Sequence, residues 1–187
     1  AHTAAPVCCP SRVAVMSGLL PSTSGIYNNG QWWKPNLPDL VTMPEHFRNN
    51  GYLAVGAGKI FHHTVGNNPP VIWDKFQRLV FNDDGFSRST GRYPTLYPYT
   101  KRQPVPKEFP YSGITLYSPE VDWGVLSKQE NEMDDYQTVK FCTDFLTRKY
   151  DKPFLLACGI FHPHLPWYEP QKYLEEVEDR WIGYEID

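Results

Sequence analysis

The chain has 187 residues, of which 41% are hydrophobic and 21% charged, and its 18 Lys and Arg against 21 Asp and Glu give a formal net charge of −3. This apolar fraction is enough for a packed core, which excludes a wholly disordered chain. The charge balance gives no electrostatic reason to expect nucleic acid or an anionic membrane as a partner. No stretch approaches the roughly 18 apolar residues of a membrane span.

The first third of the chain predicts two helices and one strand. Apolar residues at helical spacing follow Pro10 and stop before Pro21, which indicates a helix. Ser11 is more plausible as the cap of this helix than as a reactive group. Residues 44–50 predict a short second helix. Residues 52–57 are continuously apolar and predict a buried strand.

The middle of the chain, residues 64–128, shows no helical or strand period. Prolines recur through it, with aromatic residues between them. Because so long an irregular segment is unusual inside a compact domain, we interpret it as an insertion over one face of the domain.

The last third predicts a helix, a strand and a further helix. Residues between 130 and 150 have helical spacing, and the run 154–161 is unbroken and apolar, as is typical of a central parallel strand. A short helix is expected over 170–177. This order favours an α/β fold with a mainly parallel central sheet flanked by helices. The apolar stripe predicted for the first of these helices comprises Tyr136, Val139, Cys142, Leu146 and Tyr150, widened by Phe141 and Phe145.

The four cysteines are too few and too irregularly spaced for a disulfide scaffold. Cys142 and Cys158 lie in the predicted apolar helix and strand, so we interpret both as small buried hydrophobic residues. Cys8 and Cys9 are adjacent, and adjacent cysteines rarely bond each other because the geometry is strained.

Reactive side chains precede the first predicted helix. Cys8 would gain from the helix N-terminus and from Arg12, since both favour a thiolate. From the residues alone, a functional cysteine and a buried structural one are equally good explanations of Cys8.

Histidines follow both predicted strands. Lys59 and His62 come after the first strand, and His162 and His164 come after the second, at the sheet edge where active sites of α/β proteins gather. A zinc site built from these cysteines and histidines is an alternative. The spacing argues against it, because no Cys-x2-Cys or His-x3-His pair is present.

Taken in order, these segments resemble the motifs of the type I, formylglycine-dependent sulfatases. Residues 8–12 (CCPSR) and 16–18 (MSG) resemble the C-x-P-S-R signature with its downstream L-T-G, and 58–62 (GKIFH) and 162–166 (HPHLP) resemble two further motifs. The iduronate-2-sulfatase branch is closest in form. The resemblance implies an alkaline phosphatase-like fold. Residues 1–187 would then be a partial catalytic domain whose N-terminal and C-terminal parts are missing.

The resemblance also implies a sulfuric ester hydrolase with a modified residue. Formylglycine-generating enzyme would oxidise Cys8 to formylglycine (3-oxoalanine), whose gem-diol would attack the sulfur of a sulfated saccharide, as in glycosaminoglycan degradation. Ca²⁺ is the implied metal, and residue 8 would be its only ligand in this chain. The family resemblance places such proteins outside the cell, in the periplasm or in the lysosome, although no export signal is visible in the sequence.

Roles for single residues follow from the same resemblance. Arg12 would pair with the formylglycine oxygens, and Lys59 would bind a sulfate oxygen. His62 would act as the base that releases sulfate. His164 would bind sulfate and help protonate the leaving oxygen, and His162 would lie on the substrate side.

Two other functions stay open. A phosphonate or phosphate monoester hydrolase of the same superfamily can share the signature. A related protein whose Cys8 is never converted would bind sulfated glycans without turnover. With its metal site incomplete, the 187-residue chain alone is expected to be inactive.

Overall fold

The computed structural model describes residues 2–62, 68–77, 123–126, 129–164 and 167–178. These residues belong to two compact units: residues 1–94 with 138–160 form the first, and residues 95–137 with 161–187 form the second. The centre of the expected insertion, residues 78–122, lies outside the described residues.

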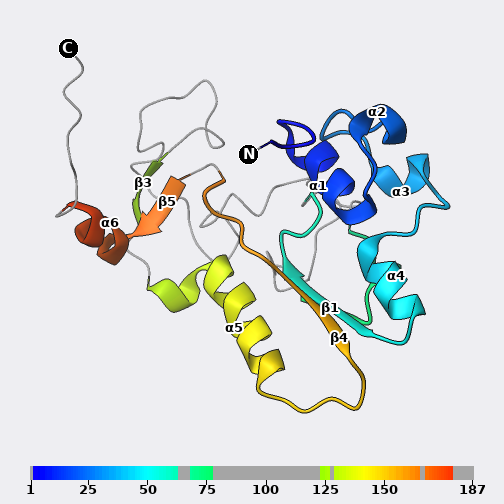
Figure 1. Ribbon diagram of the computed structural model, residues 1–187. Helices are drawn as coiled ribbons and strands as arrows, with labels where there is room; N and C mark the ends of the chain where they lie inside the picture. Colours follow the sequence, from blue (N-terminus) through cyan, green and yellow to red (C-terminus); the bar gives the residue numbers. More distant parts are fainter. Residues whose placement is uncertain (1, 63–67, 78–122, 127–128, 165–166, 179–187) are drawn as a thin grey trace. The chain divides into compact units, whose positions relative to one another are not determined.

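The first unit contains a three-stranded parallel sheet (Figure 1). Its strands stand in the order β2 (Lys75–Gln77), β1 (Leu53–Gly58) and β4 (Phe154–Gly159), and β1 pairs with both neighbours. Parallel neighbours require crossover connections, which leave room for helices on the faces of the sheet. A parallel sheet with flanking helices confirms the predicted α/β class.

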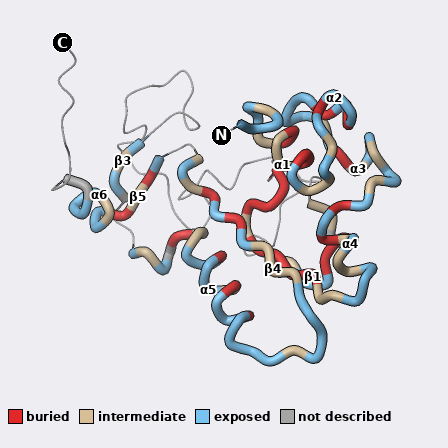
Figure 2. Tube along the Cα trace, in the orientation of Figure 1, coloured by how far each residue is buried: buried red, intermediate tan, exposed pale blue. Residues whose placement is uncertain are grey.

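Burial is greatest on β1, not on β4 (Figure 2). Val55 is fully buried, whereas Phe154 is 39% exposed and Cys158 is exposed. Among the described residues, β4 pairs only with β1. The parallel strand predicted at 154–161 forms as β4 over residues 154–159, at the edge of the described sheet, whereas the predicted burial of Cys158 is wrong. Cys142 is buried as predicted.

Helix α5 (Asp134–Leu146) covers one face of the sheet, and the main core covers the other. Successive side chains of a strand point to opposite faces. Ala157 packs against the core cluster. Its neighbour Cys158 is instead close to Cys142 of α5, and burial, together with the nearby Cys158 thiol, raises the pKa of Cys142 to about 12. The two faces of β4 thus meet different partners.

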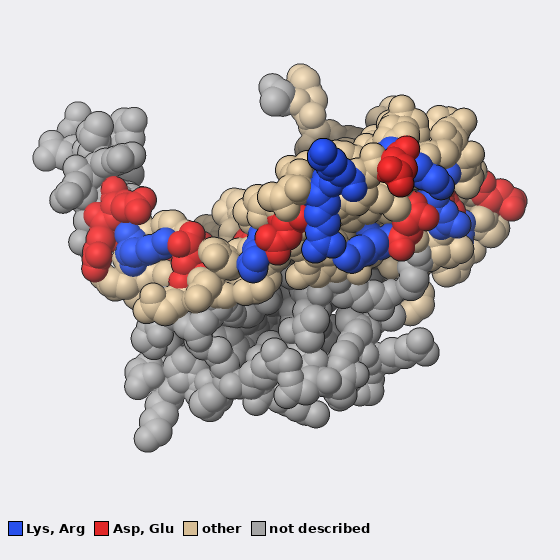
Figure 3. All heavy atoms as spheres, turned by 90° about the horizontal axis from the view of Figure 1, so that it is seen from below, with Lys and Arg blue, Asp and Glu red and all other residues tan. Residues whose placement is uncertain are grey.

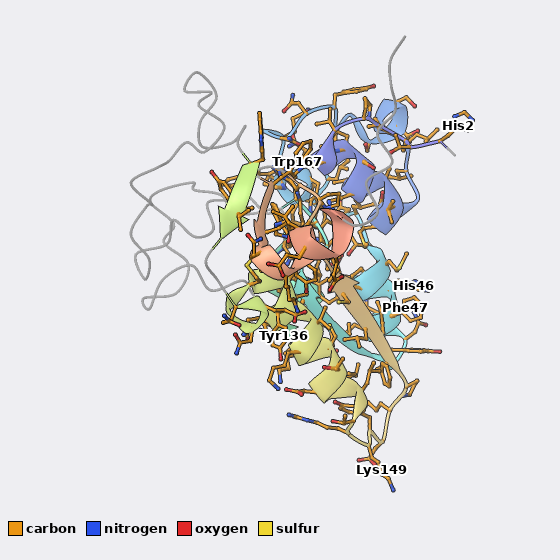
Figure 4. The ribbon with its side chains drawn as sticks, turned by 90° about the vertical axis from the view of Figure 1, so that its left-hand side faces the viewer. His2, His46, Phe47, Tyr136, Lys149 and Trp167 are labelled. Atoms are coloured by element: carbon orange, nitrogen blue, oxygen red, sulfur yellow. The ribbon has the colours of Figure 1, made fainter. Side chains whose placement is uncertain are left out.

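Helix α5 buries a different stripe from the one predicted. The buried positions of its C-terminal part are Thr138, Cys142 and Phe145, at spacings of four and three residues. The Phe145 ring meets the Phe154 ring edge-on at 5.1 Å, which fixes this face against β4. Three of the seven residues of the predicted stripe are exposed, and Tyr136 is one of them (Figure 4). The exposed members are Tyr136 (38%), Val139 (43%) and Leu146 (57%).

Helix α1 (Cys8–Ser17) begins earlier than the sequence predicted. Its N-cap residue is Val7, and no side chain caps it. The expectation that Ser11 caps the helix is wrong, because Ser11 lies within the first turn and its hydroxyl is 3.1 Å from Thr3 Oγ1. Gly18 ends the helix in the left-handed conformation, with φ of 74°.

Helix α4 (Met43–Asn49) confirms the short helix predicted for 44–50. Thr42 and Glu45 form a reciprocal capping box, in which the Thr42 N–H donates to Glu45 Oε2 at 3.0 Å. Phe47, labelled in Figure 4, meets the Tyr52 ring edge-on at 4.9 Å. This contact packs the helix against the residues that lead into β1.

Short elements complete the first unit. They include parts of the segment expected to be irregular, since β2 lies there and Ile72 is fully buried in the core. The irregularity predicted for 64–128 therefore does not extend to this end of the segment. The remaining elements are α2 (Pro21–Ser24), α3 (Trp33–Asn36) and η1 (Pro70–Ile72).

The second unit contains a two-stranded parallel sheet of β3 (Trp123–Leu126) and β5 (Trp167–Pro170). Helix α6 (Gln171–Glu178) confirms the helix predicted for 170–177, and η3 (Glu130–Glu132) precedes α5. None of the helices in the described ranges is long and apolar enough to cross a membrane. On the face shown in Figure 3, basic and acidic side chains of the described residues are interspersed.

Candidate functional site

Cys8 is the first residue of α1 and lies on the wall of a cavity. The cavity has a volume of about 460 Å³, and Arg12 and Ile60 also line it. Residues four apart share one face of a helix, which brings Cys8 and Arg12 to the same wall. Cys8 is half-buried, so its side chain is held by the protein and still reaches the cavity.

Cys9 points the other way and is fully buried. Its N–H donates to Asn29 Oδ1 at 2.8 Å, and its Sγ lies 3.3 Å from the carbonyl oxygen of Gln31. Burial raises the pKa of Cys9 to about 11, and the neighbouring Cys8 adds to the shift. Through its N–H and its thiol, Cys9 therefore anchors the loop that contains residues 29–31, and the thiol stays neutral at physiological pH.

These environments predict an order of alkylation in protein whose Cys8 is still a cysteine. Iodoacetamide is expected to modify Cys8 and Cys158 first, because their side chains reach solvent, and Cys9 and Cys142 only slowly, because both are buried and have raised pKa values. Peptide mass spectrometry over a time course measures the order, and denatured protein provides the control in which all four react. Modification of Cys9 as fast as Cys8 would contradict this assignment.

Arg12 ties α1 to the segment that follows β1. Its Nη1 donates to the carbonyl oxygen of Lys59 and, at 3.0 Å, to that of Ile60. Burial lowers the pKa of Arg12 and the nearby Cys8 partly offsets this effect, but a guanidinium remains charged in proteins. The fixed charge of Arg12 thus lies on the same cavity wall as Cys8.

Gly58 makes the turn that directs Lys59 away from β1. Its φ of 73° is left-handed, and a Cβ at this position would overlap the carbonyl oxygen of Gly159. A Cβ at Gly159 would in turn overlap the backbone of Lys59. The Lys59 N–H donates to the Gly159 carbonyl at 2.8 Å. Glycine at both positions lets the ends of β1 and β4 approach this closely.

Lys59 and His62 lie in the interior of the first unit, each with 3% of its surface exposed. Phe61, which lies between them in the sequence, is fully buried, and its ring stacks on that of Trp33 with centroids 5.3 Å apart. Lysine is almost never buried unless its charge is paired, so a buried Lys59 requires a partner for its ammonium group.

His162 belongs to the second unit and lies near two carboxylates. Its Nδ1 is 2.7 Å from Asp135 Oδ2, and its Nε2 is 3.7 Å from Glu169 Oε1. Burial raises the pKa of Glu169; the charge of His162 opposes this shift and that of Asp135 adds to it. The ring of His162 is therefore engaged by protein groups on both of its nitrogen atoms.

His164 also belongs to the second unit and is half-buried. Its N–H donates to the Phe161 carbonyl at 3.2 Å, and its ring lies 4.8 Å from the Phe161 ring. The bond between His162 and Pro163 is cis. Trp167, labelled in Figure 4, donates from Nε1 to the Pro163 carbonyl at 2.8 Å and closes the turn.

The predicted site residues fall into two groups. Cys8 and Arg12 line the same cavity, and Arg12 bonds to the backbone carbonyl oxygen of Lys59; His62 follows Lys59 in the same unit. The histidines of the 162–166 motif lie in the second unit.

The sequence analysis did not identify the residues that hold these motifs in place. Asp135 precedes its partner His162 by 27 residues, and Asn29 follows its partner Cys9 by 20 residues. Short polar side chains of this kind carry no local signal. Gly58 and Gly159, which end β1 and β4, were visible in the sequence. A glycine within or at the end of a strand often indicates that another segment of backbone approaches closely.

The surroundings of residue 8 can be compared with those that a metal site would need. Cys8 lies on a cavity wall, while Cys9 is fixed by Asn29 and Gln31, so a changed side chain at residue 8 has room. Calcium requires six to eight oxygen ligands. Across the described ranges, no group of three His, Cys, Asp or Glu residues could hold a metal. These residues alone do not form the calcium site that the sequence motifs imply.

Comparison with known proteins gives consistent matches over nearly the whole chain. A family model described as Sulfatase matches residues 1–181. A sulfatase of Formosa agariphila is 34% identical over an alignment that covers 94% of this chain and 33% of that protein. The iduronate 2-sulfatase of Homo sapiens is 27% identical and the choline-sulfatase of Rhizobium meliloti 26% identical, covering 89% and 95% of this chain and 28% and 33% of those proteins. The chain spans about a third of the length of the curated relatives it matches.

Proposed function

The chain belongs to the sulfatase family, and from this premise we propose that it supplies the nucleophile-bearing part of the active site of a sulfuric ester hydrolase. The observation that carries the proposal is the position of Cys8 on the cavity wall, with Arg12 joining its helix to the Lys59 segment. A residue held at a helix N-terminus beside a fixed cation is well placed to meet an anionic sulfate group.

Formylglycine at residue 8, formed from Cys8 by formylglycine-generating enzyme, would add water to become a gem-diol; one of its hydroxyl oxygens would attack the sulfur as the S–O bond to the alcohol breaks. Arg12 keeps a positive charge beside that oxygen and orients it. Lys59 offsets the charge that develops on the sulfate oxygens, and this effect is strong because its side chain is buried.

Two histidines are proposed to move protons. His164 donates a proton to the leaving oxygen as the S–O bond breaks, so that the oxygen departs as a neutral alcohol. His62 would accept the proton of the remaining hydroxyl of the sulfated diol, so that the C–O bond to sulfate breaks, sulfate leaves and the aldehyde is restored. A histidine can serve in either direction because its ordinary pKa lies near neutrality.

The proposed substrate is a sulfate ester of a saccharide, with an iduronate-type sugar as the first candidate. The proposal is supported by the GKIFH and HPHLP motifs and by the iduronate 2-sulfatase among the similar proteins. A choline-sulfatase is also among the similar proteins, so the name of one relative does not decide which alcohol carries the sulfate in the substrate. Calcium binding and an exported or lysosomal location are proposed on the same family grounds.

A rate comparison tests the proposed reaction. The full-length protein that carries this sequence, coexpressed with formylglycine-generating enzyme, is expected to release sulfate from an aryl sulfate and a sulfated uronate faster than phosphate from an aryl phosphate. The charges of Arg12 and Lys59 are the physical reason to expect an anionic ester as substrate. Faster phosphate release would favour the phosphate ester hydrolase. Binding of sulfated glycans without release would favour the non-catalytic binder.

A further inference from the structure

Asp135 holds the turn that follows β4 from its place in the first turn of α5. Its Oδ1 accepts the N–H of Phe161 at 2.6 Å. Its Oδ2 accepts the N–H of His162 at 3.0 Å and lies 2.7 Å from His162 Nδ1. One carboxylate therefore fixes two successive peptide units and one side chain of the same turn.

The charge state of Asp135 suits this arrangement. Burial acts to raise the pKa of Asp135, but its hydrogen bonds with the ring and N–H of His162 and with the N–H of Phe161 outweigh burial and keep the pKa below the usual value. At neutral pH the Asp135 side chain is a carboxylate, which can only accept hydrogen bonds. It can therefore accept from all three groups that face it, the two N–H groups and the His162 ring. Its side chain is 17% exposed, so these bonds are largely shielded from water.

Phe161 passes this constraint on to His164. The Phe161 N–H is held by Asp135, its carbonyl accepts the N–H of His164 at 3.2 Å, and the rings of Phe161 and His164 lie 4.8 Å apart. Both the backbone and the ring of His164 thus depend on the placement of Phe161. On the other side of the turn, Glu169 lies 3.7 Å from His162 Nε2.

We propose that Asp135 is a positioning residue for sulfate ester hydrolysis, which orients His164 through its bonds to Phe161 and His162. The inference rests on the proposed function, in which His164 protonates the leaving oxygen. Asp135 does not touch substrate in this account. Because placement errors of about 1 Å can cost about 100-fold in rate, the loss of its bonds should be visible in turnover.

The test uses Asp135→Asn in the full-length protein and two substrates that differ in the leaving group. A sugar sulfate releases an alkoxide that needs a proton, whereas nitrophenyl sulfate releases a phenolate that does not. We expect kcat to fall about 100-fold on the sugar sulfate and less than about fivefold on nitrophenyl sulfate. Combining the change with His164→Ala should cost little beyond His164→Ala alone. A merely structural role would lower both rates equally.

A second readout does not depend on turnover. Amide hydrogen exchange of Phe161 and His162 should become roughly tenfold or more faster in Asp135→Asn, because both N–H groups lose a charged acceptor. The matched control is Asp144→Asn, on the exposed face of the same helix, where the carboxylate pairs with Lys140 at 2.8 Å. It should change neither exchange in this turn nor turnover.

The outcomes separate the two proposals. If wild-type protein releases no sulfate, the proposed function fails, while the exchange data still decide whether Asp135 holds the turn. If Asp135→Asn does not fold, His162→Gln removes only the ring contact and should give a smaller loss with the same dependence on the leaving group. Equal losses on both substrates, or unchanged exchange, would overturn the inference.

Discussion

Cys8→Ala is expected to abolish sulfate release by the full-length protein, with a loss of more than roughly 10⁴-fold, because it removes the precursor of the nucleophile. Cys9→Ser should keep turnover within about threefold, since its hydroxyl can still donate to the Gln31 carbonyl in place of the thiol. The two residues are adjacent in sequence and differ in orientation, so they make a matched pair. Initial rates on an aryl sulfate measure the difference.

Thermal unfolding of both variants separates catalysis from folding. Cys8→Ala should unfold near the wild-type temperature, because Cys8 is half-buried on a cavity wall. Cys9→Ser should lose some stability, because Cys9 is fully buried in the core. If Cys9→Ser abolished turnover in folded protein while Cys8→Ala retained it, the assignment of the nucleophile would be wrong.

Gly58→Ala is expected to cost more than about 3 kcal/mol of folding free energy, because the new Cβ adds a backbone overlap to the left-handed strain. The overlap is with the carbonyl oxygen of Gly159, and the Thr138 Cγ2 would be only 2.8 Å away. Relief requires the ends of β1 and β4 to separate. That movement would displace Lys59, so activity should fall together with stability.

Gly51→Ala is the matched control for this effect. Gly51 also has a left-handed φ, of 85°, but a Cβ there meets nothing within 4 Å. Its cost should be about 1 kcal/mol, which is the strain alone. Denaturant unfolding of the two variants gives the comparison. Equal losses of stability would contradict the close approach of the two strand ends.

Short sequence patterns correctly predicted the helices and strands whose formation depends on neighbouring residues in the chain. The helix at 44–50 forms as α4 because Thr42 and Glu45 lie at capping-box spacing, and the apolar run at 52–57 forms β1. The motif at 8–12 predicted that a helix follows Cys8, and Cys8 is the first residue of α1. In these cases neighbours in sequence determine the structure.

Burial and placement of the site required contacts between distant parts of the chain. The run at 154–161 has the pattern of a central strand, yet in the described sheet β4 pairs only with β1 and has α5 on one face. Arg12 reaches Lys59 across 47 residues, and Asp135 reaches His162 across 27. Hydrogen bonds between such distant residues leave no periodic trace, so no pattern in the sequence could have paired them.

The conversion of Cys8 to formylglycine is tested most directly by a mass spectrum of the peptide that contains residue 8. It should be taken from the full-length protein coexpressed with formylglycine-generating enzyme. We expect formylglycine at residue 8 and an unmodified cysteine at residue 9. An unmodified Cys8, with the enzyme shown to convert a control sulfatase in the same cells, would contradict this expectation and favour a protein that binds sulfated glycans without turnover.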